Sequence, residues 1–499
     1  MNQNNISATE LFQRVRELLT LPDLEPKTRN KMMHDTLILC CHEGVKDTKQ
    51  AFGNLFSQVD YLCKARGIKV ADKIAIQTMR RHSNSQEPLS GEDLKYDARA
   101  LTLFISAVFE ERIPHEVNVL IPHINRPFQK GLEINNRRIR CIVKNWDSDF
   151  IRVDIDQDAD EEEYLVRLKD EENHIDHTYL WDLLKEGMQL NLLDCQVKQP
   201  IITPRLIVVE PDYLVDISSI ATCFTAFGHH PLLYLLNLMK PRANTQATLL
   251  GNFAGAALDD IINSHGKYQV NETVKSNFRE KALEFCTCPW FDAKKFYTDA
   301  SLQAFNLQQV VDILFPRTAS QAKMSAFRGE SLYDRKKAIL EPSFVCEALG
   351  IQGRVDLMTT DCKLLVEQKS GRNMNIETHQ VDPGYHSYQL EPHYVQLLLY
   401  YGVLQHNFKL SNDRVNIRLL YSKYQPQDGL MVVAYYQKLF KEAIEYRNQL
   451  VAASFEIAKE GFEHTLNEFT PEVLNVAGTQ DFFYNKYLKP QIEAITNPL

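Results

Sequence analysis

Two carboxylates and a lysine lie inside two otherwise apolar runs in the second half of the chain. Residues 350–358 (GIQGRVDLM) and 363–372 (KLLVEQKSGR) are separated by a short polar turn at 359–362 (TTDC). Aliphatic and β-branched runs on either side of a polar turn predict a β-hairpin. Asp356 lies in the first run, and Glu367 and Lys369 lie in the second. Charges in strands this apolar indicate a chemical role.

The spacing of these three charges predicts a hydrolytic metal site. Side chains two apart on a strand share a face, so Glu367 and Lys369 project together, and Asp356 can lie across from them. Two carboxylates facing each other in a half-buried hairpin repel, unless a divalent cation lies between them and a lysine stands beside it. Alternatively, Asp356 forms an ion pair with a nearby arginine, and the Glu367–Lys369 pair is a solvated strand edge.

The motif that contains these residues resembles the signature of the PD-(D/E)XK nucleases. Gly-Arg-Val-Asp ends at Asp356, and Glu-Gln-Lys ends at Lys369. Residues 392–401 (PHYVQLLLYY) are similar to the QxxxY helix of the RecB-like branch, with Gln396 and Tyr400 one helical turn apart on one face. The other interpretation is that these two residues simply line a helix flank. The resemblance implies an α/β fold with a PD-(D/E)XK, restriction-endonuclease-like core.

The same resemblance implies metal-dependent hydrolysis of phosphodiester bonds in DNA. Asp356 and Glu367, with the backbone carbonyl of Gln368, would bind one or two Mg²⁺ or Mn²⁺ ions. Lys369 would orient the attacking water. Gln396 and Tyr400 would position the DNA backbone as uncharged donors.

A further carboxylate is expected near the metal, and the sequence offers two candidates. Residues 255–262 (GAALDDII) are similar to the first nuclease helix of the family, with Asp259 in place of its histidine. Aspartate can ligate a hard cation through oxygen, although Asp259 and Asp260 can also be polar helix residues. Glu341, ahead of the hairpin, is the rival ligand. The aspartate at the histidine position also supports a second function, a catalytically inactive nuclease fold that serves as a DNA-binding or scaffolding module.

Composition is that of a water-soluble protein, with 44% hydrophobic and 24% charged residues among 499. No run of 18 apolar residues exists, and the amino terminus lacks a basic segment followed by an apolar one, so we expect a cytoplasmic protein without membrane contact. The net charge of −9 argues against general coating of nucleic acid. Residues 317–340, with six basic and two acidic residues, are either a DNA-facing segment or a solvated helical face.

The cysteine pattern predicts neither a disulfide framework nor an iron–sulfur cluster. Ten unevenly spaced cysteines in a chain of this length are not typical of a secreted scaffold. Some RecB-like nucleases hold an iron–sulfur cluster with one cysteine before the nuclease core and three after it. This chain has no cysteine beyond Cys362, and Cys223 is out of register for the first ligand. We therefore expect no iron–sulfur cluster of that kind.

The first 210 residues predict a helical region followed by a small barrel. Residues 1–110 show apolar positions at helical spacing, and 111–210 show short alternating strands with a helix at 178–186. This pattern predicts an OB-like β-barrel, which can hold single strands or serve as a docking scaffold. The strands are expected at 116–121, 138–143, 150–155, 164–168, 188–193 and 205–209. The acidic run 154–160 superficially resembles a calcium loop, but Ala159 and Leu165 replace the required glycine and glutamate, which favours a solvated loop.

The remaining chain predicts a RecB-like nuclease domain at 211–440 and a helical segment at 441–499. We expect a helix starting near Ser218 or Ser219, a core strand at 414–424 and a long helix at 430–460. Residues 206–220 resemble the entry to the nuclease domain in bifunctional replication nuclease-helicases that trim DNA flaps. That resemblance implies single-stranded DNA or flaps as substrate, in DNA repair or replication. No Gly-x-x-x-x-Gly-Lys-Ser/Thr motif occurs, so a helicase would be a further domain of a longer chain or a separate partner.

Overall fold

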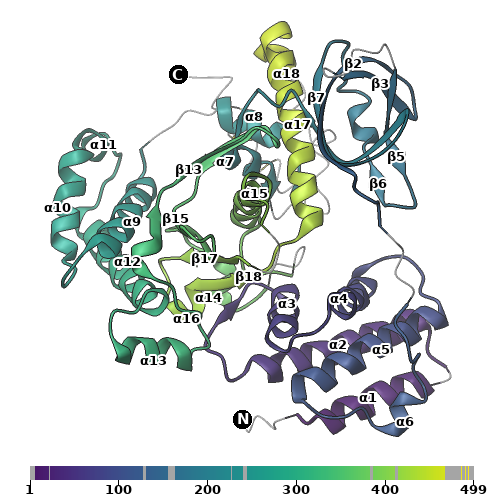
Figure 1. The fold of residues 1–499 in the computed structure, drawn as a ribbon. Coiled ribbons are helices and arrows are strands. Elements are labelled where there is room, and N and C mark those ends of the chain that lie inside the picture. The colour runs from purple at the N-terminus through teal and green to yellow at the C-terminus, as the bar shows by residue number, and fades with distance from the viewer. Residues whose placement is uncertain are drawn as a thin grey trace.

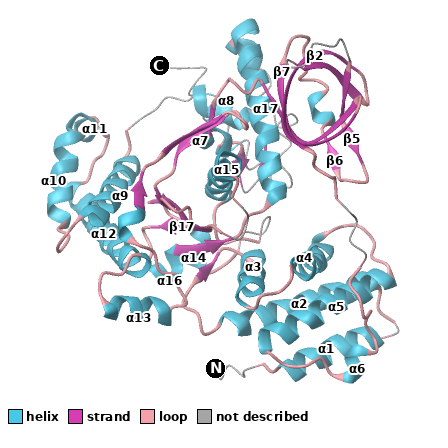
Figure 2. Ribbon diagram, in the orientation of Figure 1, coloured by secondary structure: helices cyan, strands magenta, loops and turns pink. Residues whose placement is uncertain are grey.

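The fold is mixed α/β and includes a closed five-stranded barrel, as the sequence predicts. The computed structural model describes residues 6–21, 23–126, 131–155, 163–225, 228–239, 244–381, 386–410 and 414–466, together with 485, 489, 490 and 493. Figures 1 and 2 show the N-terminal helices, the barrel and a central sheet flanked by helices as three visually distinct parts. Of the helices in these ranges, none combines the length and apolar character needed to cross a bilayer.

The N-terminal helices pack around a hydrophobic cluster of their own. The five main helices are α1 (Ala8–Thr20), α2 (Pro26–Val45), α3 (Leu55–Ala65), α4 (Val70–Asn84) and α5 (Gly91–Phe109). Capping boxes at Ser7 and Ser90 fix the starts of α1 and α5, because each serine accepts from the backbone three residues on while the acid there accepts in return. Their buried side chains, among them Phe12 and Phe104, form one cluster.

The strand expected at 116–121 is wrong, because this segment contains the short helix α6 (His115–Asn118) and a turn. Val117 and Ile121, four residues apart, both bury their side chains in the N-terminal cluster. That spacing places both on one side of a helical turn. The alternation of polar and apolar residues in this stretch is therefore not a strand signal, and the barrel begins later.

The barrel closes in the strand order β2-β3-β4-β8-β7. Its strands are β2 (Asn136–Trp146), β3 (Phe150–Ile155), β4 (Tyr164–Arg167), β7 (Gln189–Lys198) and β8 (Ile201–Val209). β4 and β8 pair in parallel and the other neighbours antiparallel. The helix expected at 178–186 is only a 3-10 turn, η1 (Thr178–Leu180), followed by further turns. The acidic run at 154–160 lies outside the described residues beyond Ile155.

A six-stranded sheet in the order β1-β18-β17-β16-β15-β12 lies at the centre of the molecule. Its strands are β1 (Ala51–Phe52), β12 (Ala338–Leu340), β15 (Leu357–Thr359), β16 (Leu364–Lys369), β17 (Asn416–Tyr421) and β18 (Leu430–Val433). Leu364 and Val366 of β16 pack against α9 (Gln246–Asn263) and α12 (Ala293–Leu314). Leu365 packs on the opposite face with α15 (Glu391–Phe408). Burial on both faces explains the continuous apolar runs in sequence.

The stretch expected as one strand at 350–358 is divided between two sheets. Its first part, β14 (Ile351–Arg354), pairs with β13 (Ser343–Cys346) and with β9 (Val215–Asp216). Its second part, β15, joins the central sheet between β12 and β16. Asp356 lies at the change of partner, where its carbonyl accepts from the Glu341 N–H at 3.0 Å. The chain therefore turns from one sheet into the other at the predicted site residue.

The long helix expected from 430 starts later, because residues 430–433 form the central strand β18. These residues are Leu-Met-Val-Val, whose apolar and β-branched side chains suit a buried strand. The helix α17 begins at Gln437 and ends at Glu460. The boundary expected at 440 falls inside this helix, whose buried residues through Val451 belong to the central cluster. Figure 1 shows α17 running between the central sheet and the barrel.

The remaining elements cover the edges of these parts. They are β5 (Lys169–Asp170), β6 (Ile175–Asp176), α7 (Ile217–Ala221), β10 (Phe224–Thr225), β11 (Gly228–His229), α8 (Leu232–Met239), α10 (Val270–Glu280), α11 (Ala282–Cys286), α13 (Ala319–Phe327), η2 (Arg335–Lys337), α14 (Met374–Thr378), α16 (Pro426–Gly429) and α18 (Phe462–Leu466). The basic segment 317–340 thus comprises α13, η2 and β12. Cys223 is fully buried in the central cluster, and burial raises the pKa of its thiol.

Candidate active site

Three predicted site residues meet directly at the end of β16. Glu367 and Lys369 project from the same face of the strand, and the Lys369 Nζ donates to Glu367 Oε1 at 2.8 Å. The same ammonium donates to Gln396 Oε1 of α15 at 2.7 Å. Gln396 therefore fixes the direction of Lys369, because the lysine side chain is held between a strand carboxylate and a helix amide.

Asp356, directly before β15, lies across from Glu367 of β16. Leu357 is the register partner of Val366, which brings the preceding Asp356 opposite Glu367. Asp356 Oδ2 accepts from the backbone N–H of Gln368 at 2.6 Å. Burial raises the pKa of Asp356, and the backbone N–H of Gln368 opposes that rise. The hydrogen bond fixes one oxygen of this carboxylate.

Glu367 is the most deeply buried acid of the group, with 2% of its surface exposed. Burial raises the pKa of Glu367 to about 8, and the charge of Asp356 adds to the rise while Lys369 opposes it. Its second oxygen, Oε2, is buried and has no hydrogen-bond partner in the described part of the chain. An unsatisfied buried carboxylate oxygen is costly, and a bound cation or a proton would satisfy this atom.

The two candidates for the additional ligand differ in their partners. Burial raises the pKa of Asp259 to about 7, and the charges of Glu341, Asp260 and Asp356 raise it further. The negative charges of Glu341 and Asp356 therefore both raise the pKa of Asp259 on α9. Glu341 follows β12, and its Oε2 accepts from the exposed Arg354 at 2.9 Å. Asp259, Glu341, Asp356 and Glu367 therefore influence one another's charge, while Lys369 pairs with Glu367 and Arg354 with Glu341.

Tyr400 contacts the strand that leads into the site. Its ring packs against Gly353, where an added Cβ would lie 2.9 Å from the ring carbon Cε1. Its hydroxyl donates to the Arg354 carbonyl at 2.6 Å, and only 3% of the residue is exposed. Tyr400 therefore positions the backbone next to Asp356. A direct contact between its hydroxyl and DNA stays a prediction.

A buried polar network that the sequence did not reveal supports the end of β16. The Gln368 Nε2 donates to Ser422 Oγ at 2.7 Å, and Ser422 Oγ donates to Gln303 Oε1 at 2.6 Å. Gln303 in turn donates to the Ser370 carbonyl at 3.1 Å. Asn306, also on α12, donates to the Ser422 carbonyl at 3.0 Å. Polar residues at helical spacing on α12 were the available signal, since Gln303 and Asn306 lie three apart among apolar neighbours.

The donor atoms suit a hard divalent cation, because they are carboxylate oxygens with one unpaired buried oxygen among them. The side chains that carry these oxygens are too widely spaced to coordinate one ion together. Within the residues that the structure describes, no group of three or more His, Cys, Asp or Glu side chains is spaced to hold a metal ion. Instead, Glu367 forms an ion pair with Lys369, and Glu341 forms one with Arg354. Binding of a metal would therefore require these carboxylates to close on it.

Comparison of the chain with protein-family models and with curated proteins finds no match. The chemical interpretation of this group therefore depends on its own geometry and on the motif that it contains.

Proposed function

We propose that this protein is a metal-dependent deoxyribonuclease with a RecB-like PD-(D/E)XK core. The observation that carries the proposal is the unpartnered Oε2 of Glu367, buried opposite Asp356 and beside Lys369. Those residue types, in that order just before β15 and on β16, with Gln396 and Tyr400 on the later helix α15, are what the nuclease motif requires. The central sheet and α9 provide the corresponding framework.

Asp356, Glu367 and the Gln368 backbone carbonyl would hold one or two Mg²⁺ or Mn²⁺ ions together with Asp259. We prefer Asp259 to Glu341 as the additional ligand, because Glu341 is paired with Arg354 whereas Asp259 forms no ion pair in the described ranges. The charges of Glu341, Asp260 and Asp356 all act on Asp259, and a cation beside Asp259 would offset this repulsion. When bound, such a metal activates a water and neutralises charge that develops on the phosphate.

The protein residues around this group would bind and orient the reactants. Lys369, held by Gln396, would donate a hydrogen bond to the attacking water and fix its direction. Arg354, whose side chain is 60% exposed, would bind a phosphate oxygen after leaving Glu341. Tyr400 would keep the backbone of Arg354 in place. The substrate would be single-stranded DNA or a flap, and the barrel would guide the strand or dock a helicase partner.

The proposal is tested by incubating the purified chain with labelled single-stranded DNA and with a flap substrate. We expect cleavage with Mg²⁺ or Mn²⁺ and none when EDTA removes the metal. A positive control nuclease of the same metal dependence verifies the buffer. Cleavage that persists in EDTA would contradict a metal-dependent site, and absence of cleavage with every metal would favour the second candidate.

The second candidate is a nuclease fold without chemistry that binds DNA or scaffolds a complex. It is favoured by one observation, the open arrangement in which Lys369 and Arg354 already neutralise two of the carboxylates. This candidate predicts DNA binding that is equally strong with and without divalent metal. The nuclease instead predicts that metal adds cleavage, so the two functions are separated by product formation.

A further inference from the structure

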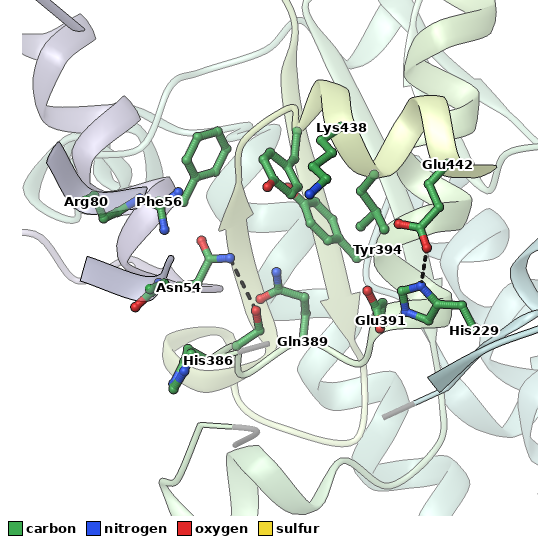
Figure 3. A pocket seen from close by; sticks show the side chains of 14 residues that line it. Asn54, Phe56, Arg80, His229, His386, Gln389, Glu391, Tyr394, Lys438 and Glu442 are labelled. Atoms are coloured by element: carbon green, nitrogen blue, oxygen red, sulfur yellow. Dashed lines mark hydrogen bonds and ion pairs between the residues drawn. The ribbon is translucent and has the colours of Figure 1, made fainter. Parts of the chain in front are cut away.

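A cavity of about 430 Å³ lies between the N-terminal helices and the central core, apart from the carboxylate group. Side chains from α3 and α4 form one wall, and side chains from β11, α15 and α17 form the other. Figure 3 shows the labelled residues converging from both sides. The edge strand β1, which pairs in parallel with β18, joins the two walls. The volume is within the range of small-molecule sites.

One side of the cavity is aromatic. The rings of Phe56 and Tyr436 lie 5.5 Å apart between centroids, and both line the cavity. The Arg80 guanidinium lies 5.3 Å from the centroid of the Phe56 ring. Aromatic side chains of this kind provide flat surfaces on which nucleobases stack.

The cavity also carries positive charge that is not paired with an acid among the residues the structure describes. Neither Arg80 nor Lys438 forms an ion pair in the described residues, and Arg80 donates to the neutral Gln77 at 2.8 Å. The two described acids of the cavity pair with His229, which also lines it, at 2.9 Å for Glu391 and 2.5 Å for Glu442. Arg80 and Lys438 can therefore bind an anionic group.

Gln389 supplies the observation that points to a ligand. This residue lines the cavity, is 2% exposed, and buries both Oε1 and Nε2 without a hydrogen-bond partner in the described part of the chain. Figure 3 places its amide between Asn54 and Glu391. Buried amides are normally satisfied on both atoms. Both atoms are closed to solvent, and Oε1 lies against Gly53. The amide would therefore turn into the cavity to bond to the donor and acceptor edge of a nucleobase.

We propose that this cavity binds one nucleotide unit. The base would stack on Phe56 and Tyr436 and bond to the Gln389 amide, and the phosphate would bind Arg80 and Lys438. The unit can come from a free nucleotide or from the end of a DNA strand, which share this chemistry. The site does not depend on the proposed nuclease activity. The cavity is nevertheless close to the proposed nuclease site. Glu391 of the cavity and Gln396 of the nuclease site are five residues apart on α15, about 7.5 Å of helix.

The test measures binding in EDTA, where no metal-dependent cleavage can occur. Titration calorimetry of the full chain uses three probes, namely deoxyadenosine 5′-monophosphate, a short 5′-phosphorylated single strand, and a closed single-stranded circle of the same composition. The variants are Arg80→Gln, Lys438→Gln and Gln389→Leu. Arg81→Gln is the matched control, because Arg81 is the exposed neighbour on α4 and does not line the cavity.

We expect the wild type to bind the mononucleotide or the linear strand. Arg80→Gln and Lys438→Gln should bind at least about tenfold more weakly, the usual scale for one charged hydrogen bond, and Gln389→Leu at least about fivefold more weakly, the scale for a neutral one. Arg81→Gln should bind like the wild type. Binding of the mononucleotide identifies a free nucleotide as ligand, whereas binding of the linear strand alone identifies a strand end. If neither probe binds, or if the circle alone binds, the proposal is overturned.

Folding and nuclease function are controlled separately. Lys438 is exposed, so Lys438→Gln tests the cavity even if Gln389→Leu lowers the melting temperature. Asp356→Ala should retain nucleotide binding, since Asp356 lies outside the cavity. If the protein proves not to be a nuclease, the expected nucleotide affinities stay the same. If all cavity variants bind the nucleotide probes as tightly as the wild type does, only the cavity proposal is refuted.

Discussion

Lys369 lies between two oxygens, 2.8 Å from Glu367 Oε1 and 2.7 Å from Gln396 Oε1. The ammonium partly compensates the buried carboxylate, whose pKa burial raises to about 8. Gln396 has no charge, so it directs the lysine without adding a competing cation or anion. This arrangement predicts that the lysine acts on the reaction and contributes little to DNA affinity.

Lys369→Ala should lower single-turnover cleavage by about 10²-fold, the usual scale of orientation and proton-transfer effects, while DNA affinity stays nearly unchanged. The two quantities are measured by rapid-quench cleavage and by fluorescence anisotropy. Lys363→Ala is the control, because Lys363 is exposed just before β16. Loss of DNA affinity with normal cleavage of bound substrate would make Lys369 a phosphate anchor instead.

Tyr400→Phe isolates the hydrogen bond to the Arg354 carbonyl, because it keeps the ring that packs against Gly353. A neutral hydrogen bond contributes about 1 kcal/mol, so we expect a five- to tenfold loss of cleavage rate with little change in melting temperature. Tyr435→Phe, in the same hydrophobic cluster, is the matched control. An unchanged cleavage rate for Tyr400→Phe would show that this bond does not position the site.

Some site residues could be predicted from sequence and others could not, for a physical reason. Asp356, Glu367 and Lys369 are visible because charges are rare inside apolar strands. Gln389 and Arg447 are equally buried but occur near polar neighbours, where glutamine and arginine are ordinary surface residues. Arg447 bonds to backbone carbonyls, which every residue carries. Hydrogen bonds to backbone carbonyls therefore leave no pattern in the sequence from which they could be predicted.

At the scale of elements, the positions of the strands could be predicted from sequence better than the strands with which they pair. The apolar run 364–369 is β16 as expected, but 350–358 changes sheets at Asp356. The reason is a set of non-local bonds, from the Glu341 N–H to the Asp356 carbonyl and from the Gln368 N–H to its carboxylate. Residues 430–433 likewise become β18 because β17 and β1 lie on either side of them.

Helix α17 connects the barrel to the core through Arg447, which is fully buried. Its guanidinium donates to the carbonyls of Gly350 at 3.1 Å, Glu210 at 2.9 Å and Tyr213 at 2.6 Å, and also to that of Val209. Burial lowers the pKa of Arg447 to about 10, so the group remains protonated at neutral pH. One side chain thus links the ends of β8, β9 and β14.

Arg447→Met should lower the free energy of unfolding by about 3 kcal/mol, because it leaves several buried carbonyls unpaired. The measurement is urea unfolding followed by tryptophan fluorescence and far-ultraviolet circular dichroism. Arg137→Met is the control, since the Arg137 side chain is 81% exposed. A change within about 0.5 kcal/mol for Arg447→Met, the range typical of surface substitutions, would contradict the linking role.

His229 joins β11 to α15 and α17 and predicts a pH-dependent stability. Burial alone would lower its pKa, but the hydrogen bonds and charges of Glu391 and Glu442 raise it to about 9. Because the folded pKa lies above the unfolded value of about 6.5, the stabilisation is fully present below pH 6.5 and is lost as pH rises through 9. The contribution is on the order of 3 kcal/mol, since each unit of pKa difference corresponds to about 1.4 kcal/mol.

The test compares melting temperatures of the wild type and His229→Gln from pH 6 to pH 10. We expect the wild type to be more stable at low pH and the difference to disappear above about pH 9. His174→Gln, in the turn between β5 and β6, is the control histidine. A difference that stays constant over this range would contradict the protonated state of His229.

At the scale of the whole molecule, the expected parts are less separate than the sequence suggests. The N-terminal region contributes β1 to the edge of the central sheet, with Ala51 and Phe52 paired to Met431 and Val432. A two-residue strand is too short to show alternation, so the sequence predicted this region as helical throughout. The cavity proposed to bind a nucleotide is lined by side chains of both the N-terminal helices and the central core.

The most direct test of the account is cleavage by Asp356→Ala and Glu367→Ala on single-stranded DNA with Mg²⁺ or Mn²⁺. Asp361→Ala is the matched control, because Asp361 lies in the same hairpin and pairs with Lys337 instead. We predict that both site variants bind DNA like the wild type but cleave at least about 10³-fold more slowly, as expected when metal ligands are removed, while Asp361→Ala cleaves normally. Full cleavage by either site variant would contradict the account.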